Sequence, residues 1–253
     1  MLILNEFLLS QRLWAFAAMT MGAVKQEECP HRITCHFPNL AACSFERTMI
    51  EDKLLDVAIA QFGQFGLEGA STRAIAKAAG TAMSSITYHY GGKEGLYLAT
   101  ADHIAAQMRE RLHPIVAAAV AGAIAPDDAI EAILRVLDAI AQIMLGPESE
   151  HWARFIVREQ MQPTEAFERI YAGAMAPVMG GMARLIAAAT GQTDPLEIRL
   201  LALTMFGQAL VFRAARATVM KAIERLDAAT EAAIRLRIRS NIHAILIAAR
   251  NEP

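Results

Sequence analysis

Aromatic residues and cysteines are scarce in this sequence. Only 6% of the 253 residues are aromatic, and the three cysteines, Cys29, Cys35 and Cys43, all lie near its start. The long remainder therefore has no disulfide framework, which favours a reducing compartment, and we expect a cytoplasmic protein. No apolar run of about 18 residues is free of charge, so we expect no membrane-spanning helix.

The motifs of common catalytic sites are absent as well. The sequence contains no G-x-S-x-G, no phosphate-binding loop, no Rossmann glycine pattern and no His-Glu metal helix. His103 and His113 lie in helical segments without evident partners, which favours structural or surface roles. We therefore expect no enzyme, no cofactor and no catalytic metal. The formal net charge of −2 does not decide whether nucleic acid is bound, because the local charge matters.

Alanine and aliphatic residues supply most of the apolar content. Hydrophobic residues make up 55% of the chain. Because alanine is the best helix former, this composition predicts an all-α fold. The length suits one or two domains with a sizeable core.

The first 46 residues differ from the rest of the chain. Two interpretations are open. In one, residues 1–46 are an N-terminal extension that is disordered or precedes a true start near Met49, where a regular helical pattern begins. In the other, the segment binds a metal or senses oxidants, although its spacing matches no standard zinc site. The residues concerned in the second interpretation are Cys29, His31, Cys35, His36 and Cys43.

Two short helices around one glycine are predicted after residue 70. A preceding helix is expected over Ile50–Phe65, where apolar residues recur at helical spacing, and glycines end it. Ser71 or Thr72 then caps a second helix, which runs to Ala79, because a hydroxyl can accept from the free N–H groups of a first turn. Gly80 suits the left-handed position that stops a helix.

The helix that follows this glycine turn is short, polar and bounded by a glycine pair. Ser84, Ser85 and Thr87 are small enough to approach base edges, while Ile86 faces the core. Lys93 opens the next helix, where its charge adds to the positive end of the helix dipole and would hold a phosphate. This order predicts a helix-turn-helix whose second helix enters the major groove.

These motifs resemble a known family. Residues 47–107 resemble the DNA-binding domain of TetR-family transcriptional regulators through "AIAQFGQFGLEGASTRAIAKAAG", "YHY" and "GGKEGLYLA". The segment Phe155–Gly191 resembles the effector domain of the CecR-like branch. The resemblance implies a homodimeric repressor that binds a palindromic double-stranded DNA operator and is released by a small-molecule effector. A helical small-molecule-binding module that does not read DNA is the alternative.

The resemblance also implies a role for individual positions. Thr72 and Arg73 would contact backbone phosphates, and Tyr90 would occupy an aromatic core position. Many family members have glycine and tyrosine at the positions of Ser84 and Thr87, and a serine where Gly92 stands here. The expected DNA-binding residues are Thr72, Arg73, Ser84, Ser85, Thr87, Tyr88, His89 and Lys93.

A second domain is expected over residues 114–250. Its helices include one that opens at Pro126 and one in which Pro177 predicts a kink or break. The last two, at about Asp194–Arg216 and Asp227–Ala249, carry apolar stripes that fit either a core or a two-fold contact between subunits.

An effector cavity is expected between the helices of this domain. Methionine and aromatic side chains adapt to varied ligands, and charged side chains could orient one; core packing and ordinary surface charges are the alternative. The candidate residues are Trp152, Phe155, Arg158, Met175, Met179, Phe206 and Arg213, with Glu159, Met161, Tyr171 and Met205 as further possibilities.

Overall fold

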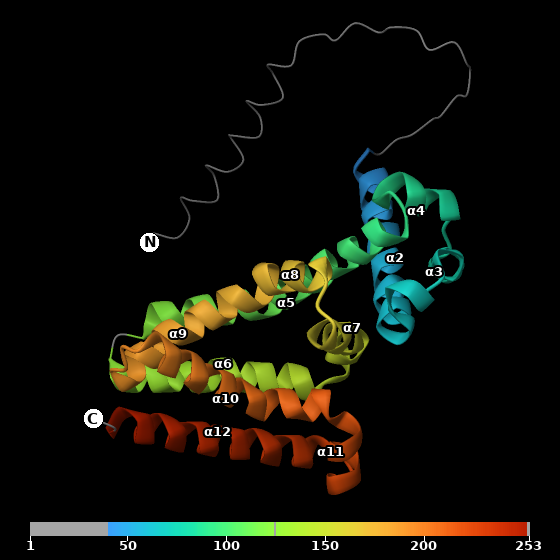
Figure 1. The fold of residues 1–253 in the computed structure, drawn as a ribbon. Coiled ribbons are helices and arrows are strands. Elements are labelled where there is room, and N and C mark those ends of the chain that lie inside the picture. The colour runs from blue at the N-terminus through green and yellow to red at the C-terminus, as the bar shows by residue number, and fades with distance from the viewer. Residues whose placement is uncertain (1–39, 124, 252–253) are drawn as a thin grey trace, which may run out of the picture. The chain divides into compact units, whose positions relative to one another are not determined.

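The computed structural model describes residues 40–123 and 125–251, and every regular element in these ranges is helical (Figure 1). The all-α prediction is confirmed. Cys29 and Cys35 lie outside the described residues, as does the side chain of Cys43. The helices, with one 3₁₀ turn (η1) and one π-helical turn (η2), are α2 Leu40–Gly69, α3 Thr72–Ala79, α4 Met83–Tyr90, α5 Lys93–Gly122, α6 Pro126–Leu145, η1 Pro147–Ser149, α7 Glu150–Met161, α8 Glu165–Ile170, η2 Tyr171–Met175, α9 Ala176–Thr190, α10 Pro195–Ala214, α11 Arg216–Ile223 and α12 Ala228–Asn251.

Local signals set the bounds of the first short helices. The Ser71 side chain caps α3 by accepting from the backbone N–H of Ala74 at 3.4 Å. Gly80 ends that helix with φ 75°, a left-handed conformation that glycine adopts without steric strain. Gly91 ends α4 in the same way, with φ 73°. These sequence predictions are confirmed.

The helix before them departs from its predicted bounds. Among the described residues α2 begins at Leu40, ahead of the predicted start near Met49. Gly66 has φ 71°, so the helix kinks there and continues to Gly69. Figure 1 shows α2, α3 and α4 gathered at the N-terminal end of α5.

The long helix α5 joins these short helices to the bundle. It runs from Lys93 to Gly122 and continues through Pro114, so no helix ends where the two expected domains meet. A proline removes one hydrogen bond from a helix interior, but the rest of the helix can be held by packing. The buried residues Leu96, Ile104 and Leu112 hold α5 against the core on both sides of the expected boundary.

Helix α6 is the centre of the bundle. Helices α5, α9, α10 and α12 all pack against it. Pro126 opens it and two aspartates lie in its first turn, where the helix dipole favours negative charge. The core positions predicted from the sequence are all buried, at most 4% exposed: Ile130, Ile133, Leu134, Leu137 and Ile140.

The C-terminal helices contain two features that the sequence did not reveal. The π-helical turn η2 ends two residues before Pro177, and the helix runs on from Glu165 through η2 and α9 to Thr190, so Pro177 follows a π-helical turn and does not end the helix. The predicted helix to Arg216 ends at Ala214, and a separate short helix, α11, follows before α12.

Two stretches are long and apolar enough to cross a bilayer by length and composition alone. They are Glu165–Thr190 and Pro195–Ala214. Helices of a bundle core pass the same test, and helices in both stretches pack against α6.

Candidate nucleic-acid interface and ligand cavities

Helix α4 presents a polar, exposed face. Ile86 is 1% exposed and anchors the helix to the core. On the other side Ser84 and Thr87 are exposed, Tyr88 is 86% exposed, and Met83 is 49% exposed. Short hydroxyl side chains beside an exposed aromatic ring can contact base edges and phosphates, and an apolar side chain such as methionine can contact a thymine methyl group.

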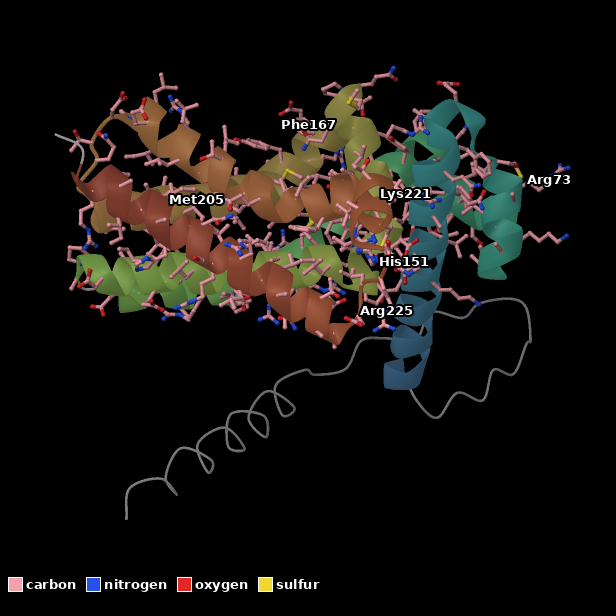
Figure 2. All side chains as sticks on the ribbon, turned by 90° about the horizontal axis from the view of Figure 1, so that it is seen from below. Arg73, His151, Phe167, Met205, Lys221 and Arg225 are labelled. Carbon is pink, nitrogen blue, oxygen red and sulfur yellow. The ribbon has the colours of Figure 1, made fainter. Side chains whose placement is uncertain are left out.

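Further predicted contacts surround this face. Arg73 extends from α3 away from the neighbouring helices (Figure 2). Thr72 opens α3 and is half-buried, as is Ser85 on α4. His89 is exposed, with its ring 5.0 Å from that of Tyr88 in an edge-on arrangement.

Lys93 has a partner within the protein. Its Nζ donates to the backbone carbonyl of Glu68 at 2.8 Å and thereby ties the end of α2 to the start of α5. An ammonium group has three donors, so two remain for a phosphate. The position of Lys93 therefore suits both a structural bond and a DNA contact.

The junction between α4 and α5 is tightly packed. A Cβ on Gly95 would lie 1.7 Å from the carbonyl oxygen of Tyr90, so only glycine fits at this position. The Tyr90 ring is half-buried against the core, and burial raises the pKa of its hydroxyl, with smaller contributions from Glu51 and Asp52. This junction fixes the direction of α4 relative to α5.

A cavity of about 540 Å³ lies within the bundle, a volume typical of small-molecule sites. Its walls come from α5, α6, α7, α8, η2, α9 and α10 and are mostly apolar. Five of the seven expected effector-site residues line it: Trp152, Met175, Met179, Phe206 and Arg213.

Other candidates lie elsewhere. Phe155 is fully buried, and its ring packs against that of Tyr97 with centroids 4.7 Å apart. Met205 is also fully buried in the bundle core. Arg158 and Met161 line a second cavity, whereas Tyr171 lines the first.

The polar groups of the larger cavity are mostly cationic. Arg111, Arg199 and Arg213 line it together with Gln160, and no acidic side chain does so among the described residues. The indole Nε1 of Trp152 is buried without a hydrogen-bond partner in the described part of the chain. A buried polar group without a partner is unfavourable, so a ligand acceptor near this N–H would be stabilising.

The second cavity has a volume of about 520 Å³ and is strongly basic. Four arginines line it, and Glu150 is the one acidic residue found in its described wall. Arg213 also donates to backbone carbonyls at the end of α6, including that of Met144 at 3.0 Å. Burial lowers the pKa of the Arg213 guanidinium, and the charge of Arg216 lowers it further, while Glu150 acts in the opposite direction. The four arginines are Arg154, Arg158, Arg213 and Arg216.

A buried polar network connects α5 to α7 and α8. Tyr97 Oη donates to Glu159 Oε1 at 2.5 Å, and both residues are at most 3% exposed. The other oxygen, Oε2, accepts from the backbone N–H groups of Thr164 and Phe167, each at 3.1 Å, and from Thr164 Oγ1 at 2.8 Å. Glu159 was a possible ligand contact, but here its carboxylate is fully used within the protein.

The chain matches known proteins in both of its halves. Residues 54–100 match the family described as bacterial regulatory proteins of the tetR family. Residues 126–249 match the C-terminal domain of the HTH-type transcriptional dual regulator CecR. The CecR protein of Shigella flexneri is 34% identical over 188 residues, which are 72% of this chain and 83% of that protein.

The protein belongs to the TetR family. It is a DNA-binding transcriptional regulator with a CecR-type C-terminal domain, and this family is not enzymatic. The predicted family and the predicted function as a DNA-binding transcriptional regulator are thereby confirmed. As a class, TetR-family regulators bind operator DNA and small effectors.

Solved structures share the fold of this TetR-family regulator. AibR, in a complex with isovaleryl coenzyme A and operator DNA, superposes with a TM-score of 0.58 at 16% identity, over 77% of this chain and 98% of that one. A TetR-like regulator from Rhodococcus sp. RHA1 gives 0.59 at 18% identity, over 80% and 97%. At these identities the likeness concerns the fold alone.

The sequence interpretation of this regulator missed the arginines that gather at the cavities. Arg154 and Arg216 line the second cavity, and Arg111 and Arg199 line the first. One signal was available: Arg154 and Arg158 are four residues apart, which puts both on one face of α7. The convergence of α5, α10 and α11 on that helix had no signal in the sequence.

Proposed function

We propose that this TetR-family regulator is a cytoplasmic homodimeric repressor. It binds a palindromic operator through Ser84, Ser85 and Thr87, with phosphate contacts from the other predicted residues of α3, α4 and α5. It leaves the operator when a small molecule occupies the larger cavity. In this scheme residues 47–107 are the DNA-binding domain and residues 114–250 form the ligand-binding and dimerisation domain.

The exposed face of α10 supports the homodimer. Contiguous exposed apolar surface marks interaction sites, and a single helix-turn-helix reads few base pairs, so two copies are needed for a specific site. Association of two subunits through this face, related by a two-fold axis, would bring two helix-turn-helix units together. Its leucine and valine side chains are 44–57% exposed: Leu196, Leu200, Leu203, Leu210 and Val211.

One observation carries the proposed release mechanism. Leu203 and Leu210 belong to the exposed face of α10 and also line the larger cavity. A molecule in the cavity therefore touches side chains of the proposed subunit contact and can alter the spacing of the two α4 helices. It does so only if it binds the two arrangements with different affinity.

The AibR structure gives further support, because that protein has the same fold and is in complex with isovaleryl coenzyme A and operator DNA. A related fold can thus accommodate both kinds of ligand. Nothing about the effector of the present protein follows from the fold alone.

The test is a DNase footprint of the full chain on DNA flanking its own gene, with a salt titration and sedimentation equilibrium. We expect a protected palindrome, an affinity that falls steeply with salt, and a dimer. Leu200→Glu should give monomers and abolish protection at concentrations where the wild type protects. Phe65→Glu, at a 47% exposed position of α2, is the control and should remain dimeric. A dimeric Leu200→Glu protein would exclude the α10 face as the subunit contact.

A further inference from the structure

The two cavities adjoin each other. Ala153, Val157, Arg213 and Ala214 line both, so α7 and the end of α10 form a shared wall. Arg213 is the one charged residue that the two described linings have in common. The Arg213 side chain therefore lies at the junction of the two cavities.

The chemistry of the walls changes sharply along this path. The larger cavity is bounded mainly by aliphatic, aromatic and methionine side chains. The second is lined by four arginines and by one acidic residue, Glu150. None of the four arginines takes part in a salt bridge in the described structure, whereas five other arginines do. Within the described lining, one acidic residue therefore faces four arginines, which leaves a net positive charge.

We propose that the two cavities form one bipartite site for an amphipathic phosphate, whose apolar chain fills the larger cavity and whose phosphate group is bound by Arg154, Arg158, Arg213 and Arg216. This assignment rests on the proposed effector site and specifies its ligand class. It extends the site toward α2, beyond the cavity predicted from the sequence.

A phosphate suits the arginines better than a carboxylate does. A phosphate group carries up to two negative charges and three free oxygens. A planar guanidinium group can donate two parallel hydrogen bonds to two of these oxygens. Arg216 Nη1 is buried without a hydrogen-bond partner among the described residues. The charges of Arg213 and Arg216 also disfavour each other, so a dianion between them relieves repulsion at both.

The phosphate end of the site touches the helix that leads into the DNA-binding part. Gly63 of α2 lines the basic cavity, and a Cβ there would lie 3.2 Å from Arg154 Cβ. Arg158 Nη2 donates to the carbonyl of Gln64 at 3.4 Å, next to the kink at Gly66. A guanidinium has five donors, so Arg158 can bind a phosphate beside this bond, and the phosphate would then lie close to the contact between α7 and α2.

Calorimetric titration of the full chain with octyl phosphate, 1-octanol, octanoate and inorganic phosphate tests the proposal. We expect octyl phosphate to bind at least about tenfold more tightly than each of the other three, since charge-assisted hydrogen bonds and apolar burial then act together. Arg154→Gln and Arg216→Gln should each weaken octyl phosphate about tenfold and leave 1-octanol unchanged. Arg184→Gln, an exposed arginine of α9 outside both linings, is the matched control and should change nothing.

Several results would overturn the assignment. If octanoate bound as tightly as octyl phosphate, a site specific for phosphate would be excluded. If inorganic phosphate bound as tightly as octyl phosphate, the apolar cavity would take no part in binding. Equal loss of affinity in the control variant would exclude a specific role for the arginine cluster. The footprint separates this failure from failure of the proposed function: a protein that binds octyl phosphate but is not released from DNA by it keeps the bipartite site and refutes ligand-released repression.

Discussion

Replacing Tyr97 by phenylalanine tests the buried link between the DNA-binding helices and α7. The change deletes one hydroxyl, which donates to Glu159 Oε1 at 2.5 Å, and keeps the ring. The ring contacts should persist, namely those to Phe62 at 4.9 Å and to Phe155 at 4.7 Å. The perturbation is therefore confined to one hydrogen bond and to the oxygen left behind.

The expected magnitude follows from the burial of both partners. Glu159 is 2% exposed, so Oε1 has little access to water that could replace the lost donor. Hydrogen bonds to charged groups contribute about 1.5–3 kcal/mol, and we expect Tyr97→Phe to lower the free energy of unfolding by about 2 kcal/mol. For a protein of this size that corresponds to a fall of about 4–8 °C in the melting temperature.

Urea unfolding of the full chain, followed by circular dichroism, measures this difference. Tyr171→Phe is the matched control, because its hydroxyl makes no side-chain hydrogen bond in the described structure and the residue is 44% exposed. We expect that variant to remain within about 0.5 kcal/mol of the wild type. A similarly small effect of Tyr97→Phe would refute the claim that the Tyr97–Glu159 bond stabilises the fold.

The pH dependence gives the same prediction a second test. Burial and the bond to Glu159 raise the pKa of the Tyr97 hydroxyl. In the unfolded chain the tyrosine pKa is about 10, lower than in the folded protein. Below that pH the stabilisation is fully present; above it the unfolded chain ionises first, so the free energy of unfolding falls as the pH rises. Phenylalanine has no proton to lose. The difference in the free energy of unfolding between the wild type and Tyr97→Phe should therefore narrow, by about 0.8 kcal/mol at pH about 10.5. A constant or widening gap would contradict a buried, protonated Tyr97.

Three further changes probe the DNA-binding end. Gly95→Ala places a Cβ 1.7 Å from the carbonyl oxygen of Tyr90. We expect it to lower the free energy of unfolding in urea by at least about 3 kcal/mol and to abolish the footprint. Normal DNA binding by this variant would show that the junction can shift. Lys93→Ala should weaken binding to all DNA sequences and reduce the salt slope by about one, and an unchanged slope would exclude a phosphate contact. Ser71→Ala removes the cap of α3 and should lower the unfolding free energy by about 0.5–1 kcal/mol, whereas Ser84→Ala, at an exposed position without a capping role, should not.

The helix-turn-helix could be predicted from sequence because its determinants are local. Ser71 caps α3, Gly80 ends it and Ile86 anchors α4 within a stretch of sixteen residues, and each acts through its own backbone conformation or burial. The recurrence of apolar residues at helical spacing likewise identified the buried side of α6. Such features need no knowledge of the rest of the fold.

The cavities could be predicted only in part, because they depend on which helices meet. Phe155 and Trp152 are both apolar residues of α7, yet one packs against Tyr97 and the other lines the larger cavity. The sequence gives their spacing but not the neighbour of each side of the helix. Arg216 lines the same cavity as Arg154 because α11 begins close to α7. Neither local sequence predicts that the two helices meet.

Helix α5 has a mechanical consequence. One uninterrupted helix contains Tyr97 at the end that packs against α4 and Arg111 and Leu112 in the wall of the larger cavity. At 1.5 Å per residue, Lys93 and Arg111 are about 27 Å apart along the axis. Such a rod acts as a lever: a rotation of about 5° about its cavity end moves its other end by about 2 Å. A displacement of that size exceeds the tolerance of a hydrogen bond to a base edge, so a small adjustment around a ligand is large enough to abolish sequence readout.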